Sequence, residues 1–183
     1  GAIKVLARAM RDADAGVRHH ALEAMARLGN REARQELTFM TNAGIGSEEV
    51  FAIGALAETS DVVYLDTFRY KLATATHLET RLAAARGLGR LGSDEGFKEA
   101  LRALRINRPL RNDPHDPAAG QILRVKQLAA AALGAIGRAD ALPALSRLME
   151  ADRDPRVQVS AARAILDILT KDQARPLPFA TGR

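Results

Sequence analysis

The chain has 183 residues, of which 47% are hydrophobic and 27% charged, as is typical of proteins with a packed interior. This composition excludes a wholly disordered or collagen-like chain, and the absence of cysteine excludes disulfides, thiolate zinc sites and a cysteine nucleophile. The net charge of +5 favours an anionic partner without identifying one.

Alanine dominates the apolar residues. The chain has 36 alanines, two Tyr, five Phe and no Trp. Because alanine is the best helix former and the smallest core side chain, this composition predicts helices that pack closely together. No apolar run approaches the roughly 18 residues needed to span a bilayer, so we expect no transmembrane segment.

In chain order, the hydrophobic pattern predicts five pairs of helices. The first helix of each pair, with apolar residues every three or four positions, is predicted at 3–10, 32–40, 62–72, 95–104 and 141–149. The second is predicted at 17–29, 50–60, 81–92, 125–137 and 157–169. The ends of the second helices lie 31, 32, 45 and 32 residues apart. This near-constant period predicts stacked helical hairpins with repeat bounds of 1–29, 31–60, 62–92, 94–137 and 140–169.

Glycine and proline mark the ends and interruptions of these helices. Three second helices are expected to end in the left-handed conformation that glycine adopts most easily, at Gly29, Gly92 and Gly137. Gly87 is interpreted as a point of close helix packing. Residues 106–120 contain three prolines, which exclude a continuous helix, so we predict an insertion that loops out between the two helices of the fourth repeat. Residues 171–183 are predicted to form an extended tail.

Two of the repeats carry a motif with a known counterpart. Residues 12–29 combine Asp12, Asp14 and Arg18 with an alanine-rich helix that ends in Gly29, and residues 141–169 follow the same pattern. This motif resembles a HEAT repeat of the short bacterial type named after phycobilisome lyases. The resemblance implies an all-α fold, a right-handed α-α superhelix (solenoid) of about five HEAT-like hairpins, in a single domain spanning residues 1–170.

The resemblance also implies a structural role for a basic column at the start of the second helices. Its members are Arg18, Arg81 and Lys126. In HEAT-like repeats such a residue typically bonds the preceding turn and neighbouring repeats. We therefore expect these three side chains to be used inside the fold, which leaves less basic charge for a binding surface.

The outward positions of the second helices are the first candidates for partner binding. Residues four apart share a helix face, and the aligned pairs mix both charge signs with small residues, unlike a groove that tracks phosphates. The candidates on these helices are His20, Glu23, Arg27, Arg86, Arg90 and Arg163.

A denser basic patch runs from the fourth repeat into its insertion. Its members are Lys98, Arg102, Arg105, Arg108 and Arg111, and His115 follows in the insertion. We interpret this patch as solvated charge, and contact with an anion or an acidic partner is the alternative. We also hypothesise that the insertion contacts the partner or a neighbouring subunit, because insertions in repeat proteins collect where hairpins turn.

The sequence predicts no catalytic residue, cofactor or metal. His19 and His20 are adjacent, so they point about 100° apart on a helix. None of the four histidines is followed by Glu, the pair through which some HEAT-like enzymes bind iron. No local signature supports a Ser-His-Asp arrangement.

These observations favour a non-catalytic scaffold or adaptor that binds a protein or peptide on a concave face lined by the second helices. Two alternatives stay open because the resemblance allows them: a bilin lyase or lyase subunit, and a nucleic-acid-binding HEAT-like protein. The abundance of Arg and Ala suggests a bacterial source. The sequence leaves the location unknown, since it fits the cytoplasm and, if a leader preceded Gly1, the cell envelope or periplasm, and the oligomeric state is not predicted.

Overall fold

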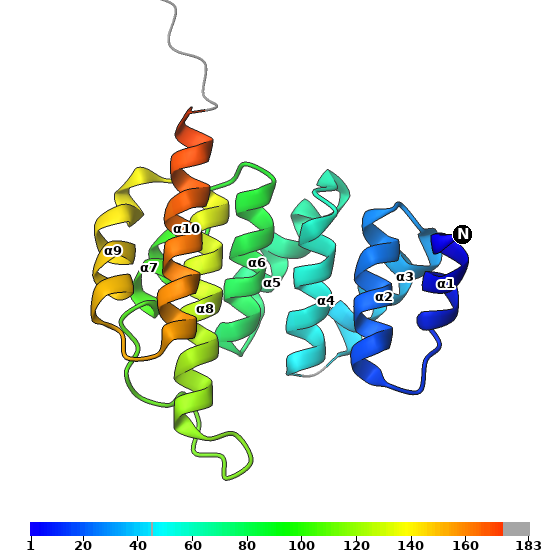
Figure 1. The fold of residues 1–183 in the computed structure, drawn as a ribbon, viewed down its shortest axis with the longest axis horizontal. Coiled ribbons are helices and arrows are strands. Elements are labelled where there is room, and N and C mark those ends of the chain that lie inside the picture. Colours follow the sequence, from blue (N-terminus) through cyan, green and yellow to red (C-terminus); the bar gives the residue numbers. More distant parts are fainter. Residues whose placement is uncertain (45, 174–183) are drawn as a thin grey trace, which may run out of the picture. The chain divides into compact units, whose positions relative to one another are not determined.

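The computed structural model describes residues 1–44 and 46–173, and this part of the chain is built from helices and contains no β-strand (Figure 1). The prediction of an all-α fold is therefore confirmed. The α-helices are α1 (Ala2–Ala9), α2 (Ala15–Arg27), α3 (Arg31–Ala43), α4 (Ser47–Glu58), α5 (Leu65–Thr74), α6 (Leu78–Arg90), α7 (Phe97–Ala103), α8 (Ala118–Ile136), α9 (Leu142–Ala151) and α10 (Pro155–Gln173). Two short 3-10 helices, η1 (Val62–Tyr64) and η2 (Ala139–Ala141), precede α5 and α9.

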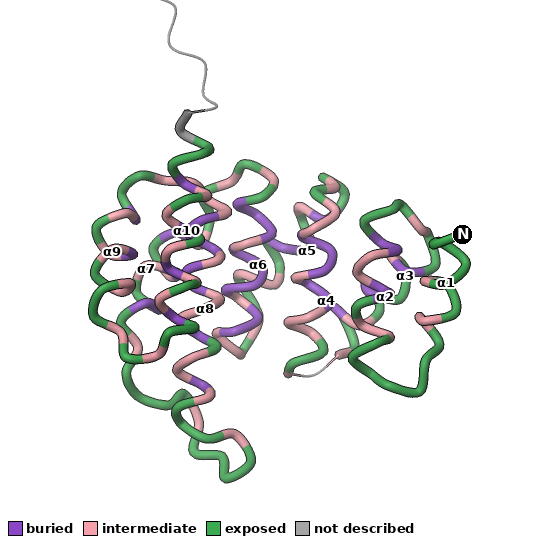
Figure 2. Tube along the Cα trace, viewed as in Figure 1, coloured by how far each residue is buried: buried purple, intermediate pink, exposed green. Residues whose placement is uncertain are grey.

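The helices divide into two compact units, and the first comprises residues 1–96. Within this first unit α1 packs on α2, α3 on α4 and α5 on α6, while α2 contacts α4 and α4 contacts α6. The buried core draws on both helices of these hairpins and includes Leu37, Ile53, Leu56, Phe68 and Leu88. Figure 2 shows buried residues concentrated along α4 and α6. The alanines of these two helices allow this close approach because their side chains are small.

The second unit begins at Phe97. Here α7 packs on α8 and α9 on α10, and the two longer helices, α8 and α10, pack on each other. Gly134 of α8 faces Ala164 of α10 so closely that an added Cβ would lie 3.0 Å from the Ala164 Cα. The core of this unit consists of fully buried aliphatic side chains, among them Val125, Leu133, Leu145, Val157 and Ile168.

The ends of the second helices follow the expected glycine pattern. Gly29, Gly92 and Gly137 have φ values of 82°, 85° and 77°, in the left-handed region. Ser60, which occupies the same column, has a φ of 51° although it carries a side chain. Four of the five predicted helix ends thus share this backbone conformation, which glycine adopts at the lowest cost, whereas the fifth, Leu169, lies inside α10.

Gly87 marks the close packing inferred from the sequence. A Cβ at this position would lie 2.7 Å from two ring carbons of Phe68, which is fully buried between α5 and α6. Because real Cβ atoms do not approach so closely, only glycine lets α6 pack against this ring.

Two predicted boundaries are wrong. The predicted insertion 106–120 ends earlier, because α8 begins at Ala118 directly after Pro117, and a proline readily precedes the first turn of a helix. The predicted tail 171–183 begins too early, because residues 171–173 belong to α10. The sequence places no helix-breaking residue before Pro176, so nothing ends the helix at position 170. Residues 174–183 lie outside the described part of the chain.

Candidate functional site

The charge of the protein is divided unequally between the two units. Residues 1–96 contain 12 Lys and Arg against 13 Asp and Glu, a net charge of −1. Residues 97–183 contain 15 Lys and Arg against 9 Asp and Glu, a net charge of +6. The basic character of the whole chain therefore belongs to the second unit.

On the second helices of the first unit, the predicted contact residues Arg86 and Arg90 are engaged by the protein itself. Glu58 of α4 forms ion pairs with both, to Arg86 and, at 3.3 Å, to Arg90. The Arg90 Nε also donates to the Ala57 carbonyl at 2.9 Å. One carboxylate thus ties two cations of α6 to α4, and the surface charge of this pair of helices largely cancels.

The remaining candidates on the second helices differ in their exposure. His20 and Arg27 of α2 are exposed and Glu23 is half-buried, and none of the three has a bonding partner among the described residues. Arg163 of α10 pairs with Asp167 one turn further along, at 3.1 Å, and both side chains are well exposed. The described second helices therefore leave α2 as the part of this face with uncommitted polar groups.

The basic column behaves as a structural element at two positions. The Arg18 Nη1 donates to the carbonyls of Asp12 and Ala13, each at 2.8 Å, in the turn before α2. The Arg81 Nη1 makes equivalent contacts two repeats further along the chain, to Ala75 at 2.8 Å and Thr76 at 3.1 Å. Each guanidinium holds the turn that leads into its own helix.

Lys126, the third member of that column, bonds differently. Its ammonium reaches forward to the Asp152 carboxylate in the turn between α9 and α10. Burial raises the pKa of Asp152, but the Lys126 ammonium and the backbone N–H of Asp154 lower it by more, so the pKa lies below its ordinary value of 3.8. The pair is therefore ionised at neutral pH and links α8 to the next turn.

The sequence analysis missed two further members of the column. Glu49 of α4 accepts from the Lys71 Nζ at 2.7 Å and from the Thr80 Oγ1 at 3.0 Å, which joins α4 to α5 and α6. Gln158 of α10 donates to the Asp152 carbonyl at 2.8 Å, six residues back, as Arg18 does to Asp12. The repeat spacing places both residues in the column, but neither is a cation, so the charge pattern that marks Arg18, Arg81 and Lys126 does not mark them.

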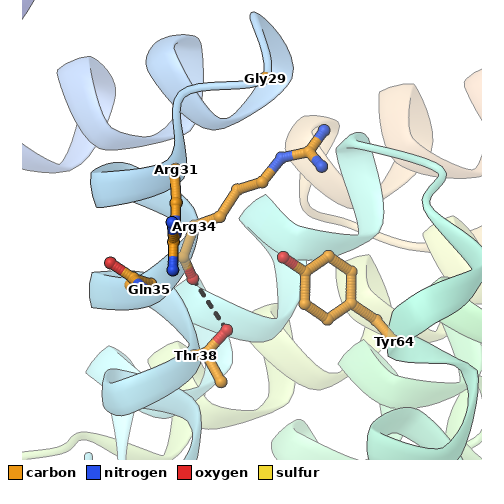
Figure 3. A pocket seen from close by; sticks show the side chains of 6 residues that line it. All are labelled: Gly29, Arg31, Arg34, Gln35, Thr38 and Tyr64. Atoms are coloured by element: carbon orange, nitrogen blue, oxygen red, sulfur yellow. Dashed lines mark hydrogen bonds between the residues drawn. The ribbon is translucent and has the colours of Figure 1, made fainter.

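A shallow hollow of about 390 Å³ opens beside α3 (Figure 3). The side chains that line it come from α3 and η1, with one glycine before α3; they are Gly29, Arg31, Arg34, Gln35, Thr38 and Tyr64. Arg34 is used structurally, since it donates to the Ala26 carbonyl at 3.1 Å and to Asp61 at 2.8 Å. The Tyr64 hydroxyl points towards α3 and has no bonding partner among the described residues. Arg31 is the cation of this hollow that remains uncommitted among those residues.

A second hollow, of about 260 Å³, lies within the second unit between α7 and α9. Its lining combines apolar side chains with charged groups: Leu104, Arg105, Lys126, Ala144, Arg147, Leu148, Ala151 and Asp152. Arg105 and Arg147 are exposed and have no partner among the described residues. The same holds for Lys98, Arg102 and Arg108, so four of the five members of the predicted basic patch remain uncommitted within the described chain.

The link between α7 and α8, residues 104–117, is held in place by one buried side chain. The Oε1 of Gln121, a fully buried residue of α8, accepts from the backbone N–H of Leu110 at 2.9 Å and of Arg111 at 3.0 Å. Its Nε2 donates to the carbonyls of Arg111 at 3.0 Å and Asp116 at 2.7 Å. These four bonds use both lone pairs of the amide oxygen and both hydrogens of the amide nitrogen.

Ion pairs reinforce the same link. Asp116 accepts from Arg111 at 3.1 Å and from Arg124 at 2.6 Å. The hydrogen bond from Arg124, followed by that from Arg111, lowers the pKa of Asp116 below its ordinary value of 3.8. Arg111, the fifth member of the predicted patch, is thus committed to the loop. His115 is exposed, and its backbone N–H donates to Asp113 at 2.9 Å in a tight turn.

The described residues contain no group of three or more His, Asp or Glu side chains placed to hold a metal ion. His19 instead stacks on Phe51, with ring centroids 4.2 Å apart, and so joins α2 to α4. Across the helices of the described chain, none is long and apolar enough to cross a membrane. Comparison with known proteins adds no assignment, since no family model and no curated protein matches the chain.

Proposed function

We propose that the protein is a HEAT-like solenoid scaffold that binds a protein or peptide on the face formed by its second helices, without catalysing a reaction. The HEAT-like arrangement is supported by the order of helix contacts, in which each hairpin packs internally and α2, α4 and α6 contact one another in sequence. It is further supported by the Arg18 and Arg81 bonds, which hold equivalent turns in the same way.

The proposed binding face is argued mainly from the open surface of α2 and α4 around Gly54. An added Cβ at Gly54 would meet no atom within 4 Å, so this half-exposed position opens outward in the middle of α4. On α2, Glu23 occupies the position equivalent to Gly54 and Arg27 lies one turn further along, and neither side chain has a partner among the described residues. The face therefore offers both charge signs beside a position where the backbone is accessible, which suits a polypeptide partner.

The experiment blocks this face at its open position. The wild-type chain, Gly54→Ala and Gly54→Trp are each immobilised, and the proteins that bind to them are identified by mass spectrometry. The affinity of each chain for every stoichiometric partner is then measured with purified proteins. Gly54→Ala is the matched control, since it changes the same position but adds a single methyl group. We expect binding to persist in Gly54→Ala and to weaken tenfold or more, about 1.4 kcal/mol, in Gly54→Trp.

Equal affinity of all three chains would contradict this choice of face. Sustained turnover of a substrate by the purified chain would contradict the non-catalytic part of the proposal.

A further inference from the structure

The hollow between α7 and α9 is lined by a largely buried ion pair, Lys126 and Asp152, and by two exposed arginines, Arg105 and Arg147. We call the ion pair the floor of the hollow and the two arginines its rim. On the floor, the Lys126 ammonium and the Asp152 carboxylate pair with each other, with side chains that are 15% and 11% exposed. The second oxygen of Asp152 accepts the backbone N–H of Asp154 at 3.0 Å. The charges of this pair cancel, so the positive charge of Arg105 and Arg147 on the rim has no counterpart in the lining.

The two rim arginines are placed by different elements. Arg105 follows the end of α7, where its backbone N–H donates to the Arg102 carbonyl at 3.1 Å, and Arg147 lies on α9. Both arginines line the hollow, one from each of these two elements. A guanidinium binds a carboxylate through two parallel N–H bonds, which makes Arg the preferred residue for recognising this group.

The rest of the lining is apolar. Leu104 is buried and Leu148 half-buried, and Ala144 and Ala151 complete the surface. Apolar walls lower the local dielectric and strengthen a charge interaction compared with open water. The volume of about 260 Å³ lies below the range of about 300–1,000 Å³ for sites that hold drug-sized molecules, so the hollow suits a side chain of a larger partner.

The positive surface continues along α7. Lys98 and Arg102 lie four residues apart on this helix and therefore share a face, and Arg105 follows three residues later. All three are exposed and have no partner among the described residues. A chain that enters the hollow with one acidic side chain would meet further cations if it continued along α7.

We propose that this hollow is a second docking site, which binds an acidic residue of an extended, acidic-apolar protein segment between Arg105 and Arg147. Apolar neighbours of that residue contact Leu104 and Leu148, and further carboxylates contact Arg102 and Lys98. The site is lined by residues of the second unit alone and shares none with the face around Gly54.

The surroundings favour a peptide over a single-stranded nucleic acid. Nucleic-acid surfaces of that kind combine positive charge with exposed aromatic rings on which bases stack. Phe97 is the one Phe, Tyr or Trp within residues 97–173, and it is buried with the Arg138 guanidinium 4.3 Å from its ring centroid. The surface of α7 therefore offers charge without a stacking platform.

The test measures fluorescence anisotropy of a labelled nine-residue peptide made of three Glu-Glu-Leu units. The neutral probe is the same peptide with Gln in place of Glu, and hexathymidylate is the nucleic-acid probe of similar charge. Arg105→Gln/Arg147→Gln removes the rim, and Lys4→Gln/Arg8→Gln removes two exposed cations of α1, so both variants lower the net charge by two. We expect the rim variant to bind the acidic peptide at least tenfold more weakly, and the α1 variant to stay within twofold of the wild type.

Three outcomes would overturn the proposal: no measurable binding of the acidic peptide by the wild type, equal binding of the Gln peptide, or an unchanged affinity in the rim variant. Tighter binding of hexathymidylate with the same dependence on Arg105 and Arg147 would assign the surface to nucleic acid. A Lys-Lys-Leu peptide, which should not bind, tests the charge preference on the wild-type chain alone. Gly54→Trp should leave peptide binding unchanged, so failure of one proposed surface is distinguishable from failure of the other.

Discussion

The two units are built from the same kind of helical hairpin, but they differ in how they treat charge and turns. In the first unit the two helices of a hairpin are joined by short links such as 10–14 and 75–77, and Glu58 forms ion pairs with two arginines of α6. In the second unit the link 104–117 is long, and although Arg111 pairs with Asp116, the exposed Arg105 and Arg108 have no carboxylate partner among the described residues. The first unit thus pairs opposite charges where α4 and α6 pack, whereas the second unit exposes a surplus of positive charge.

This difference does not arise from a need for stability. Partly exposed ion pairs contribute between zero and about 1 kcal/mol each, so the pairing in the first unit mainly removes charge from its surface. Uncompensated cations repel one another and destabilise a compact structure slightly. The net charge of +6 in the second unit, against −1 in the first, is the surplus on which the proposed docking of an acidic segment depends.

The largest effect is expected where the long link of the second unit depends on one amide. Gln121→Leu keeps a side chain of similar size but leaves the N–H groups of Leu110 and Arg111 and the carbonyls of Arg111 and Asp116 without their partner. Each such group costs about 1–3 kcal/mol when buried, and water can reach part of this loop, so we expect a loss of about 2–4 kcal/mol. Urea unfolding measures the loss, and faster hydrogen exchange at Leu110 and Arg111 locates it.

Gln127→Leu is the control for this prediction. Gln127 is half-buried on the same helix and makes one long contact, at 3.4 Å to the Ser160 hydroxyl. Its replacement should change the free energy of unfolding by less than about 1 kcal/mol. Equal effects of the two variants would show that the loop does not depend on the Gln121 amide.

The next effect contrasts two helical glycines of the first unit. Gly87→Ala forces a methyl group against the buried Phe68 ring, and overpacking of this kind costs about 1–3 kcal/mol. Gly54→Ala meets no atom within 4 Å and gains helix propensity, so it should stabilise the unit by about 0.5–1 kcal/mol. Opposite signs in thermal unfolding are the expected result. A destabilised Gly54→Ala would contradict the open position on which the proposed face depends.

A smaller effect is expected from a substitution that leaves cations of the first unit without a carboxylate partner, as Arg105 is in the second unit. Glu58→Gln removes the carboxylate that pairs with Arg86 and Arg90, which leaves two half-buried cations on α6 without it. We expect a stability loss of about 1 kcal/mol at low salt, and a smaller difference from the wild type in 1 M NaCl, where charge repulsion is screened. Glu36→Gln, at an exposed carboxylate of α3 without a partner among the described residues, should show no such salt dependence. Identical salt profiles of the two variants would argue against cancellation by Glu58.

The sequence predicted the features that repeat and missed those that occur once. The hydrophobic period located ten helices within residues 1–44 and 46–173, and the glycine column located the left-handed ends at Gly29, Gly92 and Gly137, because each signal recurs. Gln121 could not be found in this way, since a single glutamine before an apolar pair looks like any exposed polar residue. Its role depends on where residues 104–117 fold back, which no local pattern encodes.

The candidate site shows the same limit. The basic patch was visible as a run of cations, but the commitment of Arg111 to Asp116 and the absence of such a partner at Arg105 depend on tertiary contacts. Arg147 lies far from the patch in sequence and was not included in it. Only the packing of α9 beside the end of α7 brings it to the hollow.

The smallest predicted effect concerns acid pH and the floor of that hollow. Because the pKa of Asp152 is lower in the folded chain than its ordinary value of 3.8, its pair with Lys126 stabilises the fold at pH values above about 4. This contribution disappears as the pH falls below 3.8 towards the folded pKa, where the carboxylate becomes protonated in both states. The stability difference between the wild type and Asp152→Asn, up to about 1 kcal/mol at pH 7, should therefore shrink between pH 5 and pH 2.5 in urea titrations.

Glu150→Gln is the control for this prediction, because it removes an exposed carboxylate of α9 that has no partner among the described residues. The stability difference between Glu150→Gln and the wild type should not shrink over the same pH range. A wild-type advantage over Asp152→Asn that does not shrink as the pH falls would contradict a contribution from the ionised pair, because the Asp154 and Gln158 bonds to this turn need only oxygens that Asn also carries.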